Sequence, residues 1–168
     1  LLNKDISIVN LKKNFFLKHY NVKTCSMNNY DHELYWNDLN KKTILGKIYQ
    51  NYFLYPILRK YVNGRLIDIG AGLGDFCKFY TNSVAADINK LAVENYKKRN
   101  LEGTLIINNK MNYKDATFDT AILDNVIEHI DYPLPLLIEV KRILKKHANL
   151  IIGVPGQKGF KSDFDHKV

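Results

Sequence analysis

The second half of the chain alternates between short apolar runs and longer segments in which apolar residues recur every three or four positions. The short runs predict five β-strands, at residues 65–70, 83–88, 104–108, 118–124 and 149–155. The longer segments predict helices at residues 74–80, 89–100 and 133–146. Strands without a polar face that alternate with helices indicate a parallel sheet covered on both sides. We therefore expect a doubly wound α/β domain.

Two of the predicted helices carry start signals in the sequence. Asn89 stands at the N-cap position of the helix at 89–100, where its side chain can accept a backbone hydrogen bond. Prolines fall in the first turn of the helix at 133–146, where their missing N–H group costs no helical hydrogen bond. These signals place the two helices after the second and the fourth predicted strand.

The first 62 residues are rich in aromatic residues and show no strand-like alternation. Their apolar residues at helical spacing form one possible stripe: Leu34, Leu39, Ile44, Leu45, Ile48, Tyr52, Tyr55 and Leu58. The pair Asn63-Gly64 then predicts the end of the helical region. We expect a helical N-terminal extension over residues 1–62 and an α/β domain over residues 63–168. An aromatic group in this extension fits either a lid over a ligand site or ordinary core packing: Tyr30, Tyr35 and Trp36.

Composition narrows the function classes only a little. With 168 residues, 46% of them hydrophobic, the chain can form one domain with a sizeable core. No apolar run is long enough to span a bilayer, and the first residues do not have the pattern of a signal peptide. Cys25 and Cys77 do not form a disulfide or metal-binding framework, so we expect a reduced, cytoplasmic protein.

The net charge of +8 comes mainly from lysine. A positive charge is compatible with nucleic-acid binding. The lysines are scattered or occur in short pairs where helices would face solvent, and arginine, the better reader of phosphates and bases, is rare. A solvated surface is therefore the favoured interpretation, and an RNA substrate stays open as an alternative.

The segment LIDIGAGLGDF at residues 66–76 places three glycines directly after the first predicted strand. In sheets of this kind, ligands bind beyond the carboxyl ends of the strands. We expect Gly70 to permit the turn, Gly72 to let a ligand approach the backbone, and Gly74 to let the next helix pack closely. The spacing departs from the dinucleotide fingerprint, which requires a small residue where Asp75 stands, and no P-loop lysine follows.

Two acidic residues indicate the kind of ligand. Asp68 precedes the glycine loop and would repel a pyrophosphate, whereas it would attract a positively charged group. Asp87 ends the second strand, a position at which a carboxylate accepts hydrogen bonds from ribose hydroxyls. The pair therefore favours a nucleoside that carries positive charge. S-adenosylmethionine has a ribose, an ammonium group and a sulfonium.

Four segments resemble, in order and spacing, the motifs of class I S-adenosylmethionine-dependent methyltransferases of the type 11 group: DIGAGLG at 68–74, ADI at 86–88, FDTAILDNVIEHI at 118–130 and LIIGVP at 150–155. This resemblance implies a Rossmann-like fold with S-adenosylmethionine as the cofactor. It also implies methyl transfer to an acceptor, for which a small molecule, a lipid or a saccharide is favoured. The alternatives are a cofactor-binding scaffold without catalysis and an RNA methyltransferase.

The resemblance implies cofactor-binding roles for Asp68, Gly70, Ala71, Gly72, Gly74, Asp87, Ile88, Asn108, Asp124 and Asn125. By this resemblance Asp87 binds the ribose and Ile88 packs against the adenine. Related enzymes usually have an acid after the third strand that reads the adenine amino group. Asn108 stands in that neighbourhood instead, and its side-chain carbonyl can accept the same hydrogen bond. Asp124 and Asn125 would face the methionine end of the cofactor.

Two histidines are candidate general bases. His129 matches the histidine of the family pattern hEHI/V, although a structural role at the start of a helix is the preferred interpretation. His166 lies in the segment after the fifth strand. Glu128 is expected to face solvent or to act as an acid at a helix N-terminus. Asp163 and Asp165 precede His166, but this pattern lacks a further ligand, so no metal site is predicted.

Two kinds of motif and some of the strands found in related enzymes are missing from this sequence. The letters DNVIEH at 124–129 differ from the Asn/Asp-Pro-Pro-Tyr/Phe motif typical of enzymes that methylate exocyclic base amines, and no Pro-Cys pair is present for attack on a pyrimidine ring. Related sheets normally have seven strands, whereas this chain predicts five. We therefore expect the C-terminal strands to be missing. The fifth strand would then be an exposed edge unless another chain, as in a homodimer, covers it.

Overall fold

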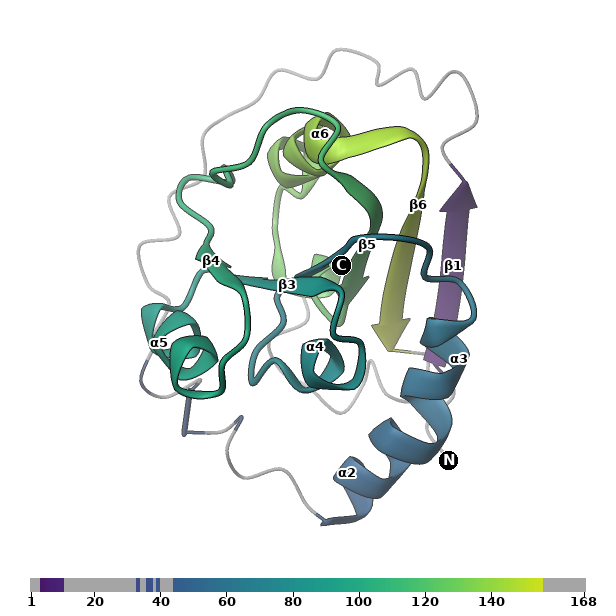
Figure 1. The fold of residues 1–168 in the computed structure, drawn as a ribbon, viewed down its shortest axis with the longest axis vertical. Coiled ribbons are helices and arrows are strands. Elements are labelled where there is room, and N and C mark those ends of the chain that lie inside the picture. The colour runs from purple at the N-terminus through teal and green to yellow at the C-terminus, as the bar shows by residue number, and fades with distance from the viewer. Residues whose placement is uncertain (1–3, 11–32, 34–35, 38, 40–43, 156–168) are drawn as a thin grey trace.

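The computed structural model describes residues 4–10, 33, 36–37, 39 and 44–155 (Figure 1). Six strands form one sheet in the order β1-β6-β5-β2-β3-β4. Their bounds are Lys4–Asn10 (β1), Leu66–Ile69 (β2), Ser83–Asp87 (β3), Gly103–Leu105 (β4), Phe118–Asp124 (β5) and Leu144–Pro155 (β6). Strands β2 to β6 all run parallel to one another. The predicted Rossmann-like parallel sheet is confirmed.

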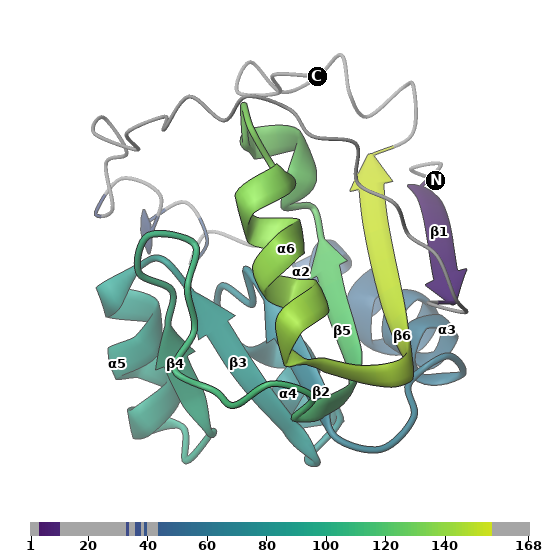
Figure 2. The ribbon, with the colours of Figure 1, turned by 90° about the horizontal axis from the view of Figure 1, so that it is seen from above.

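Helices cover both faces of the sheet because its strands are apolar on both sides (Figures 1 and 2). The bounds are Ile44–Tyr49 (α2), Gln50–Leu54 (η1, a π-helical turn), Tyr55–Arg59 (α3), Asp75–Phe79 (α4), Lys90–Lys98 (α5), Ile127–His129 (η2, a 3₁₀ turn) and Leu134–Ile143 (α6). Asn89 caps α5, since its side chain accepts a hydrogen bond from the backbone N–H of Leu91 at 2.9 Å.

Alternate residues of each strand serve different cores. In β2, Ile67 and Ile69 pack in the cluster under α6, whereas Leu66 packs with α3 and α4 on the opposite face. In β5, Leu123 belongs to the α6 side and Ile122 to the α3 side. This period of two is the spacing at which successive side chains of a strand point to opposite faces. The sheet is therefore buried on both faces. Because its strands are parallel, the connections from strand to helix all leave it at the same end.

The outer edge of the parallel sheet corrects two expectations. Residues 4–10, predicted as part of a helical extension, form strand β1, which pairs antiparallel with β6 from Lys4–Pro155 to Asn10–Asn149 (Figure 2). The fifth predicted strand, β6, is therefore not an exposed edge, because the chain's own N-terminal strand covers it. The physical reason is that β6 offers a row of unpaired N–H and C=O groups that another strand can satisfy.

The helical part of the extension is confirmed over 44–59, but its apolar stripe is not continuous. Tyr55 and Leu58 are buried as expected, whereas Leu45 and Tyr52 are more than 70% exposed. The π-helical turn η1 contains Tyr52 and ends directly before the buried set. A π-helical turn inserts an extra residue and rotates the following side chains around the helix axis, so one spacing rule does not extend through it. Leu34 lies outside the described residues.

A buried ion-pair network fixes the connection between β4 and β5 to α6. The side chain of Glu139 is fully buried and accepts hydrogen bonds from Arg142 Nε at 2.8 Å, Lys110 Nζ at 3.0 Å and the backbone N–H of Met111 at 2.9 Å. Arg142 also donates to the carbonyl of Tyr113 at 2.8 Å. The hydrogen bonds from Arg142 lower the pKa of Glu139 to about 2.

Candidate functional site

The glycine loop after β2 is held by left-handed backbone conformations that favour glycine. The φ angles are 71° at Gly70, 54° at Gly72 and 73° at Gly74. A Cβ on Gly70 would overlap a methyl group of Val126, and a Cβ on Gly74 would lie 2.8 Å from Leu101. These two glycines are therefore required by packing as well as by the turn.

Gly72 differs from its two neighbours in the loop. A Cβ at this position would meet only the methyl groups of Leu39, the nearer at 3.3 Å. Leu39 belongs to the helical residues ahead of α2, and from the same region Trp36 packs against a cluster that includes Ala71. The tip of a leucine side chain moves easily, whereas backbone does not. Gly72 is therefore the loop position at which a ligand could replace a side-chain contact.

Asp87 joins the glycine loop to the end of β3. Its Oδ2 accepts a hydrogen bond from the backbone N–H of Gly72, and its Oδ1 accepts one from the N–H of Asn89, both at 2.9 Å. The residue is only 3% exposed. Each carboxylate oxygen can accept more than one hydrogen bond, so this arrangement orients the carboxylate and is compatible with further bonds from ribose hydroxyls.

Three carboxylates lie at or one residue before the carboxyl ends of three neighbouring strands. Asp68 in β2, Asp87 in β3 and Asp124 in β5 are brought together by the strand order and register. Burial raises the pKa of the Tyr55 hydroxyl, and the negative charges of Asp75, Asp68 and Asp124 raise it further. Asp68 and Asp124 both act on this hydroxyl, so the two carboxylates lie near the same part of the molecule, and negative charge there favours a positively charged ligand.

Cys77 lies beneath this edge as a buried core residue. Its thiol donates a hydrogen bond to Asp68 Oδ2 at 3.9 Å. Burial, followed by the charge of Asp68, raises the pKa of the thiol well above its usual range. A thiol with a raised pKa is a poor nucleophile, so the interpretation of Cys77 as a packing residue agrees with its surroundings.

The remaining expected cofactor residues lie around the same edge. Ile88 is half-buried and packs against the core cluster under α6. Asn125 is exposed, has a φ of 56° and donates its backbone N–H to the carbonyl of Gly153 at 2.8 Å. Asp124 is half-buried. The cofactor contacts of these side chains stay predictions.

Asn108 occupies an exposed two-residue turn. Ile107 and Lys110 exchange backbone hydrogen bonds of 3.0 and 2.8 Å, and the two asparagines between them have φ angles of 50° and 59°. Positive φ at both central positions is the type I′ pattern, in which asparagine is favoured. The turn by itself therefore explains why an asparagine stands at position 108. The contact of Asn108 with adenine stays a prediction.

The turn η2 carries one candidate base and one unexpected acid. His129 is half-buried and donates its backbone N–H to the carbonyl of Val126 at 3.2 Å. Glu128, expected to face solvent or to act as an acid at a helix N-terminus, lies in the first turn of η2 and is only 3% exposed. The solvent-facing alternative was wrong because the turn is packed against the sheet through Ile127 and Ile130, which contact the core cluster under α6. The apolar letters on both sides of Glu128 were the available signal.

The other candidate base, His166, lies outside the described residues. Within the part of the chain that the structure describes, no three His, Cys, Asp or Glu residues are placed to share a metal ion. Across the same residues, no helix has the length and apolar character needed to cross a membrane.

These residues fit the S-adenosylmethionine implied by the sequence resemblance. Asp87 is oriented at the tip of β3 for a ribose, and Gly72 leaves the backbone approachable except for a leucine tip. The negative potential from Asp68 and Asp124 suits a sulfonium and an ammonium group.

Comparisons with known proteins agree with this assignment. The chain is 30% identical over 97 residues to the uncharacterized protein MJ1123 of Methanocaldococcus jannaschii, covering 58% of this chain and 47% of the relative. It therefore spans about half the length of that relative. The solved PH0226 protein from Pyrococcus horikoshii is 28% identical, with a TM-score of 0.56 over 68% of this chain and 59% of that one.

A SAM dependent methyltransferase from Aquifex aeolicus has the same fold, with a TM-score of 0.58 and 19% identity over 74% of this chain and 72% of that one. The family described as "Methyltransferase domain" matches residues 67–152, which is just over half of the 168 residues. The match covers the sheet from β2 to β6 and every expected cofactor residue. The chain belongs to this methyltransferase-domain family, and its cofactor is S-adenosylmethionine.

Proposed function

We propose that this chain transfers a methyl group from S-adenosylmethionine to a small-molecule, lipid or saccharide acceptor. The observation that carries the proposal is the hydrogen bond from the Gly72 N–H to Asp87. This bond holds the glycine loop against the end of β3, next to the strands that carry Asp68 and Asp124. The cofactor supplies a methyl group that its sulfonium already activates. Asp87 would bind the ribose, while Asp68 and Asp124 supply the negative potential that favours the positive charge.

Transfer requires the chain mainly to hold the reacting groups in line and to exclude water. A base is needed only when the acceptor must lose its proton early. His129 is the described candidate, because it is half-buried in the turn that follows β5. His166 is proposed as a second candidate on sequence grounds alone.

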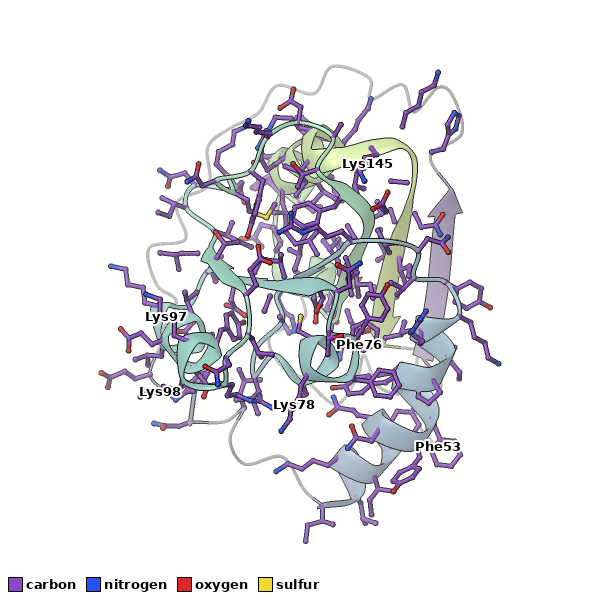
Figure 3. The ribbon with its side chains drawn as sticks, viewed as in Figure 1. Phe53, Phe76, Lys78, Lys97, Lys98 and Lys145 are labelled. Carbon is purple, nitrogen blue, oxygen red and sulfur yellow. The ribbon has the colours of Figure 1, made fainter. Side chains whose placement is uncertain are left out.

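The distribution of surface charge supports the same class of acceptor as the motifs. Lys78, Lys97 and Lys98 are exposed on α4 and α5 (Figure 3). Lys145 belongs to strand β6 and pairs with Asp119 at 2.9 Å (Figure 3). Positive charge that is distributed and partly paired does not mark one phosphate-binding track, which supports a small acceptor over RNA.

A second candidate function is cofactor binding without turnover. The observation that favours it is Asn108, which stands in an exposed type I′ turn where related enzymes usually have an acid that reads the adenine. A chain of this kind would keep the fold and the hydrogen bond between Gly72 and Asp87 but would lack the geometry for methyl transfer.

Labelled S-adenosylmethionine separates the two functions. We expect the wild-type chain, incubated with small-molecule, lipid and saccharide fractions, to label one of them. Asp87→Ala should lose that labelling and bind S-adenosylhomocysteine about tenfold more weakly, because a charged hydrogen-bond acceptor is worth about 1.5–3 kcal/mol. Glu94→Ala, a change at an exposed residue of α5, is the matched control and should behave as wild type.

Two outcomes would count against this function. Tight binding of S-adenosylhomocysteine with no labelled fraction would favour the non-catalytic candidate. Unchanged affinity in Asp87→Ala, measured by isothermal titration, would refute the ribose role of this residue.

A further inference from the structure

Glu128 is a buried carboxylate whose two oxygens have no hydrogen-bond partner among the described residues. Two other buried acids among the described residues are satisfied. Glu139 accepts from Arg142, Lys110 and a backbone N–H, and Asp87 accepts from two backbone N–H groups. Glu128 is therefore exceptional, and buried polar groups of folded proteins are nearly always hydrogen-bonded.

An unpartnered carboxylate in a protein interior destabilises the fold, because the ion has lost its contact with water. Ile127 and Ile130 on either side of Glu128 pack against the core cluster, so the turn itself would be served as well by a neutral side chain. The carboxylate therefore adds nothing to packing. A ligand that donates hydrogen bonds to the Glu128 oxygens would explain why a carboxylate stands at this position.

The position of Glu128 indicates which ligand. The turn η2 follows directly from the tip of β5 and packs against β6. Val126, two residues earlier, lies against Gly70 of the glycine loop. Glu128 therefore belongs to the same edge of the sheet as the loop and the strand-end carboxylates.

The hydrogen-bonding chemistry of Glu128 indicates which group of the ligand it contacts. An ionised carboxylate only accepts hydrogen bonds, so its partner on a ligand must be a donor. S-adenosylmethionine brings one primary ammonium group with three N–H donors to this edge, and such a group pairs well with a carboxylate. We propose that Glu128 binds the α-ammonium group of the cofactor's methionine portion, after a small shift of η2 exposes its oxygens.

Two probes that differ in this group test the proposal without knowledge of the acceptor. S-adenosylhomocysteine carries the ammonium group, whereas 5′-methylthioadenosine has the same nucleoside without the amino acid. We expect Glu128→Gln to weaken binding of S-adenosylhomocysteine about tenfold or more, as for a lost charge-assisted hydrogen bond. Its affinity for 5′-methylthioadenosine should stay within about twofold of wild type. Glu94→Gln on α5 is the matched control and should change neither affinity.

Several results would overturn the proposal. Equal weakening of both probes would indicate that Glu128 only supports the fold, and no change in either would show that the carboxylate does not meet the cofactor. Loss of methyl transfer with both affinities intact would assign Glu128 to the acceptor side instead.

A second measurement tests the ammonium contact without a variant of Glu128. Should Glu128→Gln not fold, wild-type protein can be titrated with S-adenosylhomocysteine and its deaminated analogue, and equal affinities would refute the ammonium contact. The proposal rests on the assigned cofactor and not on turnover. Neither probe donates a methyl group, so absence of labelled product would contradict the proposed function and leave this measurement valid.

Discussion

At the scale of single residues, the glycines of the loop after β2 have distinct physical roles. Gly70 and Gly74 face neighbours that leave no room for a Cβ, while the space over Gly72 contains only the methyl groups of Leu39. Val126, which closes the space over Gly70, comes from the turn that also carries Glu128. One residue without a side chain therefore lets the ends of β2 and β5 approach each other.

Gly70→Ala tests this close approach. We expect a loss of about 1–3 kcal/mol in the free energy of unfolding, because a Cβ meets Val126 and the φ of 71° strains alanine. Urea denaturation measures the loss. Adding Val126→Ala should recover the steric part of it, and the two changes should therefore not be additive. The same substitution at Gly46, inside helix α2, should be neutral or stabilising. A Gly70→Ala protein as stable as wild type would contradict the packing argument.

At the scale of elements, α6 does more than cover one face of the sheet. Its buried Glu139 and the neighbouring Arg142 hold the backbone of residues 111–113, so the segment between β4 and β5 is fixed by one helix. Lys110 and Arg142 remain partly exposed. The carboxylate is therefore the buried member on which the network depends.

This network makes stability depend on acid pH. The pKa of Glu139 is about 2 in the folded chain and 4.5 ordinarily, so its contribution is complete above about pH 4.5 and is lost as the pH falls toward 2. Glu139→Gln should lower the free energy of unfolding by about 3 kcal/mol at neutral pH. It should also flatten the decline between pH 4.5 and 2 in denaturation series. An unchanged slope in that window would show that other carboxylates control acid unfolding.

At the scale of the whole molecule, the sheet is completed from its N-terminal end. Strand β1 pairs with β6 over seven register positions and runs antiparallel to five otherwise parallel strands. The proposed cofactor site lies at the carboxyl ends of β2, β3 and β5, away from this outer strand. Stability at the edge and binding at the site should therefore be separable.

Removal of residues 1–10 tests that separation. We expect a lower melting temperature and self-association visible by light scattering, because the edge of β6 becomes available for pairing with other chains. Affinity for S-adenosylhomocysteine should change little for the molecules that stay folded. A truncated chain that remains monomeric and equally stable would show that β1 does not protect the edge.

The amino-acid sequence by itself determined the elements whose signals are local. The apolar runs, the Asn89 cap and the spacing of the glycine loop indicated the five parallel strands, the helix starts and the cofactor class. The helix predicted over residues 133–146 ends earlier, because β6 begins at Leu144. Such signals depend on side-chain period and turn chemistry within a few residues.

Only the tertiary structure decided features whose partners are distant in the chain. The pairing of Asn10 with Asn149 depends on an edge that exists only after the sheet has formed. The bond between Gly72 and Asp87 depends on two loops meeting, and the burial of Glu128 depends on the packing of η2 against the sheet. Local pattern cannot encode these contacts, because burial and pairing are properties of the assembled layers.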